Sequence, residues 1–253
     1  MIDLQKASLW KRISAALFDC ILLVIVAVGA AAGLSGLLGY EGYVSQVNEA
    51  YDHYSKEYGV DLRMSEEEFN QLTATEQENF KAANKAINAD ANAVRAYKMS
   101  QHLPLLMVTF GVLCGVLLIE LLAPLMFGNG QTLGKKIFGI ALMRIDGVKM
   151  TSLQLFVRSI LGKFAVELMI PIFIFINLYW FGSISIVSIA VLLLLLLSQV
   201  ICLARTRTGS LLHDVMAGTV AVDMASQMIF ETKEAQLEYI KKLHAQEAAE
   251  AAY

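Results

Sequence analysis

The sequence predicts an α-helical integral membrane protein. We expect four transmembrane helices, an extracytoplasmic helical hairpin, and a small cytoplasmic β-hairpin followed by an interfacial helix. Hydrophobic residues make up 57% of the 253 residues and charged residues only 17%, whereas charged residues average about 25% in soluble domains. Four apolar segments approach or exceed the ~20 residues that cross a bilayer, and a polar insertion separates the first two.

The four spans follow from runs of apolar residues. We expect them at 13–39, 103–127, 164–181 and 184–204. The last two are separated only by Gly182 and Ser183, so 164–204 should form an antiparallel hairpin joined by a tight turn. The three cysteines lie singly in apolar runs without metal-ligand spacing, so we expect no disulfide, cofactor or metal site.

Orientation follows from the distribution of lysine and arginine. These residues gather in the segments that would share one side of the membrane: the residues before the first span, 128–163, 205–223 and 224–253. Basic loops are retained in the cytoplasm. We therefore expect a cell-membrane protein with both termini cytoplasmic. The segment 40–102, where acidic residues outnumber basic ones, should be extracytoplasmic.

The insertion 40–102 has the pattern of a helical hairpin. Its first arm carries tyrosines at helical spacing, at Tyr43, Tyr51, Tyr54 and Tyr58. Ser65 and Glu68 form a capping-box pattern, from which a second arm should continue to the second span. The tyrosines form either the hairpin's own seam or a partner-binding surface, because tyrosine is favoured at interfaces.

The segment 128–163 has a different pattern. An apolar run precedes Asp146-Gly147, a strong hairpin signal. Thr151 and Gln154 then form a capping box for an amphipathic helix suited to the membrane interface. In 205–223 we expect a short helix at 211–217 with Ser210 as N-cap, and a third strand at 217–222. The tail 224–253 should be helical and solvated.

Ionisable residues inside spans are costly and usually face other protein groups. Arg12 and Asp19 are seven residues apart and share a helix face. Glu120 should lie at a similar depth on the second span, and Glu167 near the start of the third. We expect these groups to converge near the cytoplasmic ends of the helices, with the basic neighbours Lys163, Arg205 and Arg207.

Two interpretations of this convergence remain open. In the first, the acids only neutralise the basic residues and tie the helix ends together. In the second, Asp19 and Glu120 form a proton or cation site, because a buried carboxylate beside another has a raised pKa. The pair His213-Asp214 lies on the short helix. We expect Asp214 to cap or to pair with Lys135 rather than to hold a metal.

These residues resemble those of the RDD family of membrane proteins. Arg12, Asp19 and Asp214 match its three naming residues, and 130–147 is similar to its segment after the second helix. The resemblance covers 8–39 and 103–223, so Lys135, His213 and Asp214 would form a family-motif cytoplasmic site. It implies a multi-pass membrane protein, for which transport has been proposed. The insertion and the tail depart from the family pattern.

Function is expected to be transport of an ion or small solute, coupled to protonation of the intramembrane carboxylates. The alternative is a non-catalytic adaptor or regulator that binds a partner through the hairpin. Motifs typical of soluble enzymes are absent, so we expect no enzyme. The expected partners are the lipid bilayer, a proton or monovalent cation, and a second copy or another membrane protein. The net charge of −3 gives no basis for nucleic-acid binding.

Overall fold

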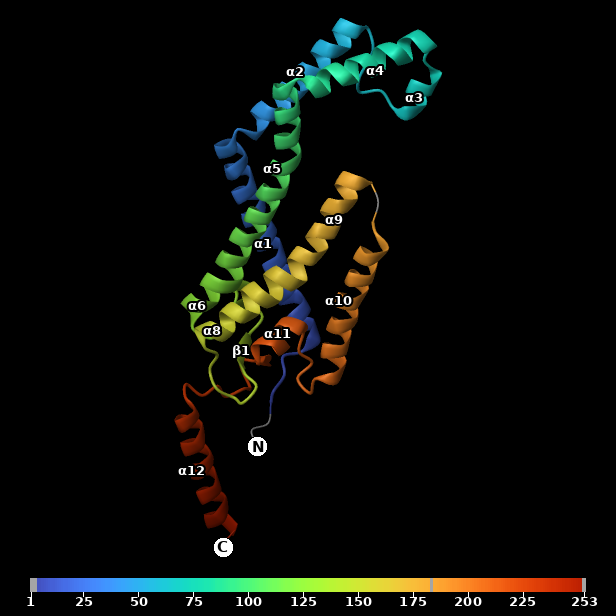
Figure 1. Ribbon diagram of the computed structural model, residues 1–253. Helices are drawn as coiled ribbons and strands as arrows, with labels where there is room; N and C mark the ends of the chain where they lie inside the picture. Colours follow the sequence, from blue (N-terminus) through green and yellow to red (C-terminus); the bar gives the residue numbers. More distant parts are fainter. Residues whose placement is uncertain (1–3, 183, 252–253) are drawn as a thin grey trace. The chain divides into compact units, whose positions relative to one another are not determined.

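The computed structural model describes residues 4–182 and 184–251. It confirms the helical membrane class, because four helices are long and apolar enough to cross a membrane (Figure 1). They span Leu9–Leu38, Ala91–Phe127, Ser152–Leu178 and Ile186–Arg205. The chain divides into two compact units, Met1–Ala27 with Val112–Tyr253, and Val28–Gly111.

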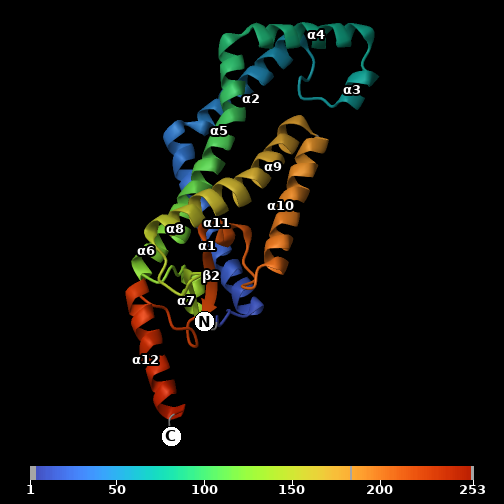
Figure 2. The same ribbon diagram turned by 60° about the horizontal axis from the view of Figure 1, so that its bottom comes forward.

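The first unit holds most of the helices. Its elements begin with α1 (Leu9–Leu38), which continues into the second unit, and with the end of α5 (Ala91–Gly115). They continue as η1 (Val116–Leu122), α6 (Ala123–Phe127), α7 (Leu133–Ile137), α8 (Ser152–Phe156), η2 (Val157–Leu168), α9 (Met169–Phe181), α10 (Ile186–Arg205), α11 (Leu212–Ala217) and α12 (Lys233–Ala251). Helices α9 and α10 run side by side in both views (Figures 1 and 2). Ser183, part of the expected turn, lies outside the described residues.

Two segments are π-helical rather than α-helical. η1 lies between α5 and α6, and η2 lies between α8 and α9. The helix that begins at Ser152 therefore continues into the third span, and the prediction of a separate interfacial helix was wrong. The capping box of Thr151 and Gln154 is confirmed. Arg158, on the polar face of this helix, is not solvated by lipid headgroups, because it is buried against acids of the protein.

The expected β-hairpin is replaced by a different pairing. β1 (Ile140–Arg144) pairs antiparallel with β2 (Thr219–Asp223), in the register Ile140↔Asp223. The turn at Asp146-Gly147 does form, because Gly147 has φ 87° and donates to the Arg144 carbonyl at 3.0 Å. The residues after it make only a single bridge to β1. The backbone of Lys149 instead donates to the Phe230 carbonyl.

Both faces of this small sheet are covered. Ile140 and Leu142 pack with Ala15 of α1, and Ala141 and Met143 pack on the opposite side with the valines of β2. Successive residues of a strand point to opposite faces, so a run with both faces buried reads as continuously apolar. The sheet thereby fixes the N-terminal part of α1 against the segment 128–144.

The short helix after α10 begins one residue later than expected. Leu211, and not Ser210, is the N-cap of α11, without a side-chain cap bond. The Gln199 side chain of α10 accepts from the Leu212 N–H instead, at 3.0 Å. Gly218, with φ 64°, ends the helix as expected and leads directly into β2.

The second unit contains the end of α1 and most of α5. Between them lies a helical hairpin of α2 (Tyr40–Tyr58), α3 (Glu66–Gln71) and α4 (Ala74–Ala89). Tyr51, Tyr54 and Tyr58 pack on its buried core. Three of the four candidate partner-binding tyrosines thus contribute to the hairpin's own seam, while Tyr43 is half-buried on α2.

The second arm is not one continuous helix. The capping box of Ser65 and Glu68 is present, but the helix that it starts ends at Gln71. A second capping box, of Thr73 and Glu76, starts α4. Asp90 then interrupts the arm: its backbone is extended, and its carboxylate accepts from the Asn92 N–H at 2.8 Å. A side chain that caps the next helix in this way favours a helix boundary.

Candidate functional site: a buried charge cluster

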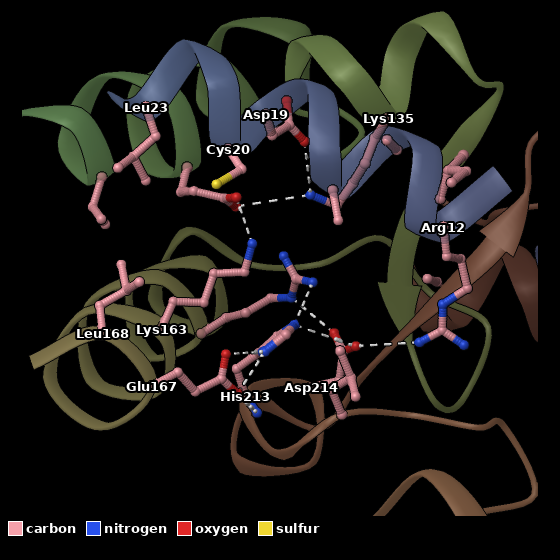
Figure 3. Close-up of a pocket in the computed structure, with 18 residues that line it drawn as sticks. Arg12, Asp19, Cys20, Leu23, Lys135, Lys163, Glu167, Leu168, His213 and Asp214 are labelled. Atoms are coloured by element: carbon pink, nitrogen blue, oxygen red, sulfur yellow. Dashed lines mark hydrogen bonds and ion pairs between the residues drawn. The ribbon is translucent and has the colours of Figure 1, made fainter. Parts of the chain in front are cut away.

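A cavity of about 250 Å³ lies inside the first unit and is lined by ionisable side chains. Figure 3 shows side chains from α1, α7, η2 and α11 pointing into it. Four acids and four cations line the cavity together with His213: Asp19, Glu120, Glu167, Asp214, Arg12, Lys135, Arg158 and Lys163. With His213 neutral, these charges sum to zero. We call this set the charge cluster.

Asp19 is held by the first turn of α7. Thr132, the N-cap of α7, donates its hydroxyl to Asp19 Oδ2, and the Gly134 N–H donates to Oδ1 at 2.8 Å. A Cβ at Gly134 would lie 2.9 Å from the Asp19 carboxyl carbon, closer than side chains tolerate. Glycine therefore permits the close approach of α7 to α1.

Lys135 lies between two carboxylates from different helices. Its Nζ is 3.7 Å from Asp19 Oδ2 and 3.8 Å from Glu120 Oε2. Lys163 Nζ lies 2.5 Å from the other Glu120 oxygen. Burial lowers the pKa of Lys135 to about 8, although the charges of Glu120 and Asp19 favour its protonation. At pH 7 Lys135 is therefore mostly protonated, but it titrates within reach of physiological pH.

A second chain of contacts joins η2 to α11. Arg158 Nε donates to Asp214 Oδ1 at 2.8 Å, and Arg158 Nη2 lies 3.0 Å from His213 Nε2. His213 Nδ1 lies 2.9 Å from both oxygens of Glu167. Arg12 donates to the Gly209 carbonyl at 2.6 Å and lies 4.0 Å from Asp214.

These contacts determine the protonation of His213. Burial lowers its pKa, so the imidazole is neutral at pH 7. Arginine can only donate, so Nε2 accepts from Arg158 and Nδ1 carries the proton that it donates to Glu167. Burial raises the pKa of Asp214, but the charge of Arg158 and the hydrogen bond that Arg158 donates outweigh burial and hold this pKa well below its usual range.

The family comparison extends over most of this unit. The family model described as RDD family matches residues 6–218. The chain belongs to the RDD family. No curated protein and no solved structure matches the sequence. The three residues on which the family resemblance rested, Arg12, Asp19 and Asp214, all line the cavity of this RDD-family protein.

In this RDD-family protein the π-helical turn of η2 determines that Arg158 and Lys163 both face the charge cluster. Arg158 and Lys163 are five residues apart, which on an α-helix would place them about 140° apart. A π-helix bonds residue i to i+5, so its wider turn brings such residues much closer to the same face. Gly162 lets α11 approach, because a Cβ there would lie 2.6 Å from His213 Cβ.

The structure brings together the four intramembrane residues that the sequence singled out. Arg12, Asp19, Glu120 and Glu167 all line the cavity. Glu120 pairs with the expected neighbour Lys163, whereas Asp19 pairs with Lys135 and Arg12 approaches Asp214.

Two further expectations were wrong. Lys135 does not pair with Asp214, whose buried partner is Arg158. Arg205 and Arg207 are exposed and do not line the cavity. Sequence reasoning missed the central place of Arg158, since an α-helical pattern put it on a membrane-surface face. The signal in the sequence that could have placed it was its spacing of five residues from Lys163, which matches the i to i+5 bonding of a π-helix.

Proposed function

We propose that this RDD-family protein exchanges a monovalent cation for a proton across the membrane, with the charge cluster as its site. The observation that carries the proposal is Lys135, whose ammonium lies 3.7 Å from Asp19 and 3.8 Å from Glu120 and whose pKa is about 8. A group that titrates near neutral pH between two acids can exchange its charge for that of a bound ion.

The exchange follows from charge balance. When Lys135 loses its proton, the cluster carries one net negative charge and Asp19 loses the only cation within 4.0 Å among the described residues. A monovalent cation between Asp19 and Glu120 restores neutrality. Glu120 Oε2 is suited to bind it, since it has no hydrogen-bond donor among the described residues.

The charged groups that face Lys135 act equally on its ammonium and on a bound cation. Asp19 of α1 and Glu120 of η1 attract a positive charge, whereas Arg158 and Lys163 of η2 repel it. Because ammonium and cation compete for the same two carboxylates, only one positive charge is held at a time. The proton carrier in this proposal is Lys135, instead of the carboxylates considered from the sequence.

Reconstitution into liposomes tests the proposal. With a pH-sensitive dye inside, addition of Na⁺ or K⁺ outside should move protons in wild-type vesicles, with the steepest change in rate near pH 8. Asp19→Asn and Lys135→Met should abolish the coupled flux. Asp223→Asn is the matched control, because Asp223 pairs with Lys11 outside the cavity. Flux equal to that of empty vesicles, or coupling that survives Lys135→Met, would refute the proposal.

Two further parts of the proposal concern its setting. The lysines and arginines between the spans favour a cell-membrane protein with both termini cytoplasmic. Four helices make a narrow path, so we expect a homodimer or a partner membrane protein. Crosslinking in membranes, followed by mass measurement, would reveal either; a chain that stays monomeric while transporting would exclude both.

A second candidate is a membrane adaptor that binds a partner through the hairpin. A cavity of about 360 Å³ between α2, α4 and the start of α5 supports it, lined in part by Tyr51, Asn84 and Tyr97. Tyr97 is 49% exposed. Deletion of 44–98 tests this function: partners that co-purify with the full chain should be lost. If they all remain, the hairpin is not the binding module.

A further inference from the structure

A second and larger cavity lies where two spans end. Its volume is about 810 Å³, and it shares no lining residue with the charge cluster. Lys6, just before the start of α1, and Arg207, just after the end of α10, both line it. Because these two positions flank the ends of membrane-spanning helices, the cavity lies at the level of a membrane surface.

The lining combines positive charge with apolar surface. Lys6 and Arg207 are exposed, and neither has an ion pair among residues 4–182 and 184–251. Lys233 Nζ lies 4.0 Å from Asp146, the one acid in the lining, which pairs more closely with Arg144 at 2.8 Å. The cavity therefore carries a net positive charge.

The apolar part of the lining comes from Leu4, before α1, and from two further segments. Ile145, after β1, is 54% exposed, and Leu237, on the first turns of α12, is 50% exposed. Leu237 and Ile240 lie three positions apart on α12, so they share a face of that helix. Exposed apolar side chains beside unpaired cations suit an amphiphile better than a small anion.

We propose that this cavity binds the headgroup of an anionic phospholipid. Lys6 and Arg207 hold the phosphate, because both side chains donate charge-assisted hydrogen bonds to phosphate oxygens. The apolar side chains of Ile145, Leu237 and Ile240 contact the glycerol backbone and the first carbons of the acyl chains. Basic residues next to spanning helices attract anionic lipids in this way.

Native mass spectrometry of the full-length protein tests the proposal. The protein is released from nanodiscs that contain phosphatidylglycerol and phosphatidylcholine in equal amounts. Wild type should retain phosphatidylglycerol selectively, and Lys6→Gln with Arg207→Gln should retain at least about tenfold less. Arg205→Gln with Lys241→Gln is the control: it removes two exposed charges outside the cavity. Equal loss in both double variants, or in neither, would overturn the proposal.

Two more measurements separate folding and ligand source from binding. The exchange Lys6→Arg with Arg207→Lys preserves both charges and should keep the selectivity, which a misfolded variant would not. Inorganic phosphate is then added to lipid-depleted protein. If phosphate binds at millimolar concentration through the same two residues and phosphatidylglycerol does not displace it, the ligand is a soluble phosphate and the lipid proposal fails.

Discussion

Arg158 of η2 and Asp214 of α11 form a buried ion pair, with Arg158 Nε 2.8 Å from Asp214 Oδ1. Removal of one partner from such a pair leaves an uncompensated charge, which costs about 3–5 kcal/mol. We therefore expect Arg158→Met to lower the thermal unfolding midpoint strongly in detergent micelles. Arg144→Met, which breaks the exposed pair with Asp146, should cost less than about 1 kcal/mol.

The double variant Arg158→Met with Asp214→Leu is the decisive comparison. It removes both charges, so it should be more stable than Arg158→Met alone. If the two variants unfold at the same midpoint, the pair does not couple η2 to α11.

Thr132 binds the Asp19 carboxylate and is also the N-cap of α7. Its hydroxyl donates to Asp19, accepts from the Lys135 N–H as the N-cap of α7, and also accepts from Lys135 Nζ at 3.1 Å. Thr132→Val keeps the shape but loses all three bonds, so we expect a loss of about 2 kcal/mol. Thr151→Val, at an exposed N-cap of α8, should lose only about 1 kcal/mol. Chemical denaturation measures the stability of both variants; equal losses would mean that the side-chain bonds of Thr132 to Asp19 and to Lys135 Nζ contribute nothing.

Glycine is required where α7 and α11 approach their neighbours. Gly134→Ala should push α7 away from Asp19, and Gly162→Ala should push α11 away from η2, because each new Cβ would lie under 3.0 Å from a neighbouring atom. Overpacking of this kind costs about 1–3 kcal/mol. Gly36→Ala is the control, since nothing lies within 4 Å of its Cβ position. Unfolding midpoints that do not separate these variants would contradict the packing argument.

The buried histidine predicts how stability varies with pH. The pKa of His213 is lowered by burial, while an unperturbed histidine titrates near about 6.5. Below that pH the unfolded chain binds a proton that the folded chain does not, so stability falls as the pH falls from 7 to 5. Asp214, with its lowered pKa, adds a second loss below about pH 4.

Thermal midpoints measured from pH 8 to 5 check the histidine's part. His213→Gln removes the titrating group, so its midpoint should change less over this range than that of wild type. A wild-type midpoint that rises toward pH 5 would mean that His213 is stabilised in its charged form.

The amino-acid sequence predicts the four spans and the convergence of the acids, but not which acid pairs with which basic residue. Runs of apolar residues and capping boxes are local signals, and both appear in the structure at Thr151 and Ser65. Pairing depends on contacts between distant segments. The placement of Lys135 between Asp19 and Glu120 requires α7 to lie against α1, which no local pattern records.

The π-helices were the second obstacle. Reasoning from a 3.6-residue period assigned Arg158 to the membrane surface, whereas the wider turn of η2 directs it into the cluster. The β-sheet failed for a related reason: the Asp146-Gly147 turn was recognised, but β1 takes its main partner from Thr219–Asp223, far along the chain. A turn sequence shows where the chain reverses, but it does not determine which of several apolar segments pairs with β1.

The neutrality of the charge cluster is reached only late in synthesis. The helix Ala91–Phe127 contributes Glu120 alone, while Lys135 and Lys163 follow it in the chain. Until those lysines are made, the Glu120 carboxylate lacks both of them, and a charge within a span costs up to about 2.5–3.5 kcal/mol, the value for the bilayer centre. We therefore expect that a nascent chain that stops at Phe127 holds this helix in the bilayer less firmly than the full chain does.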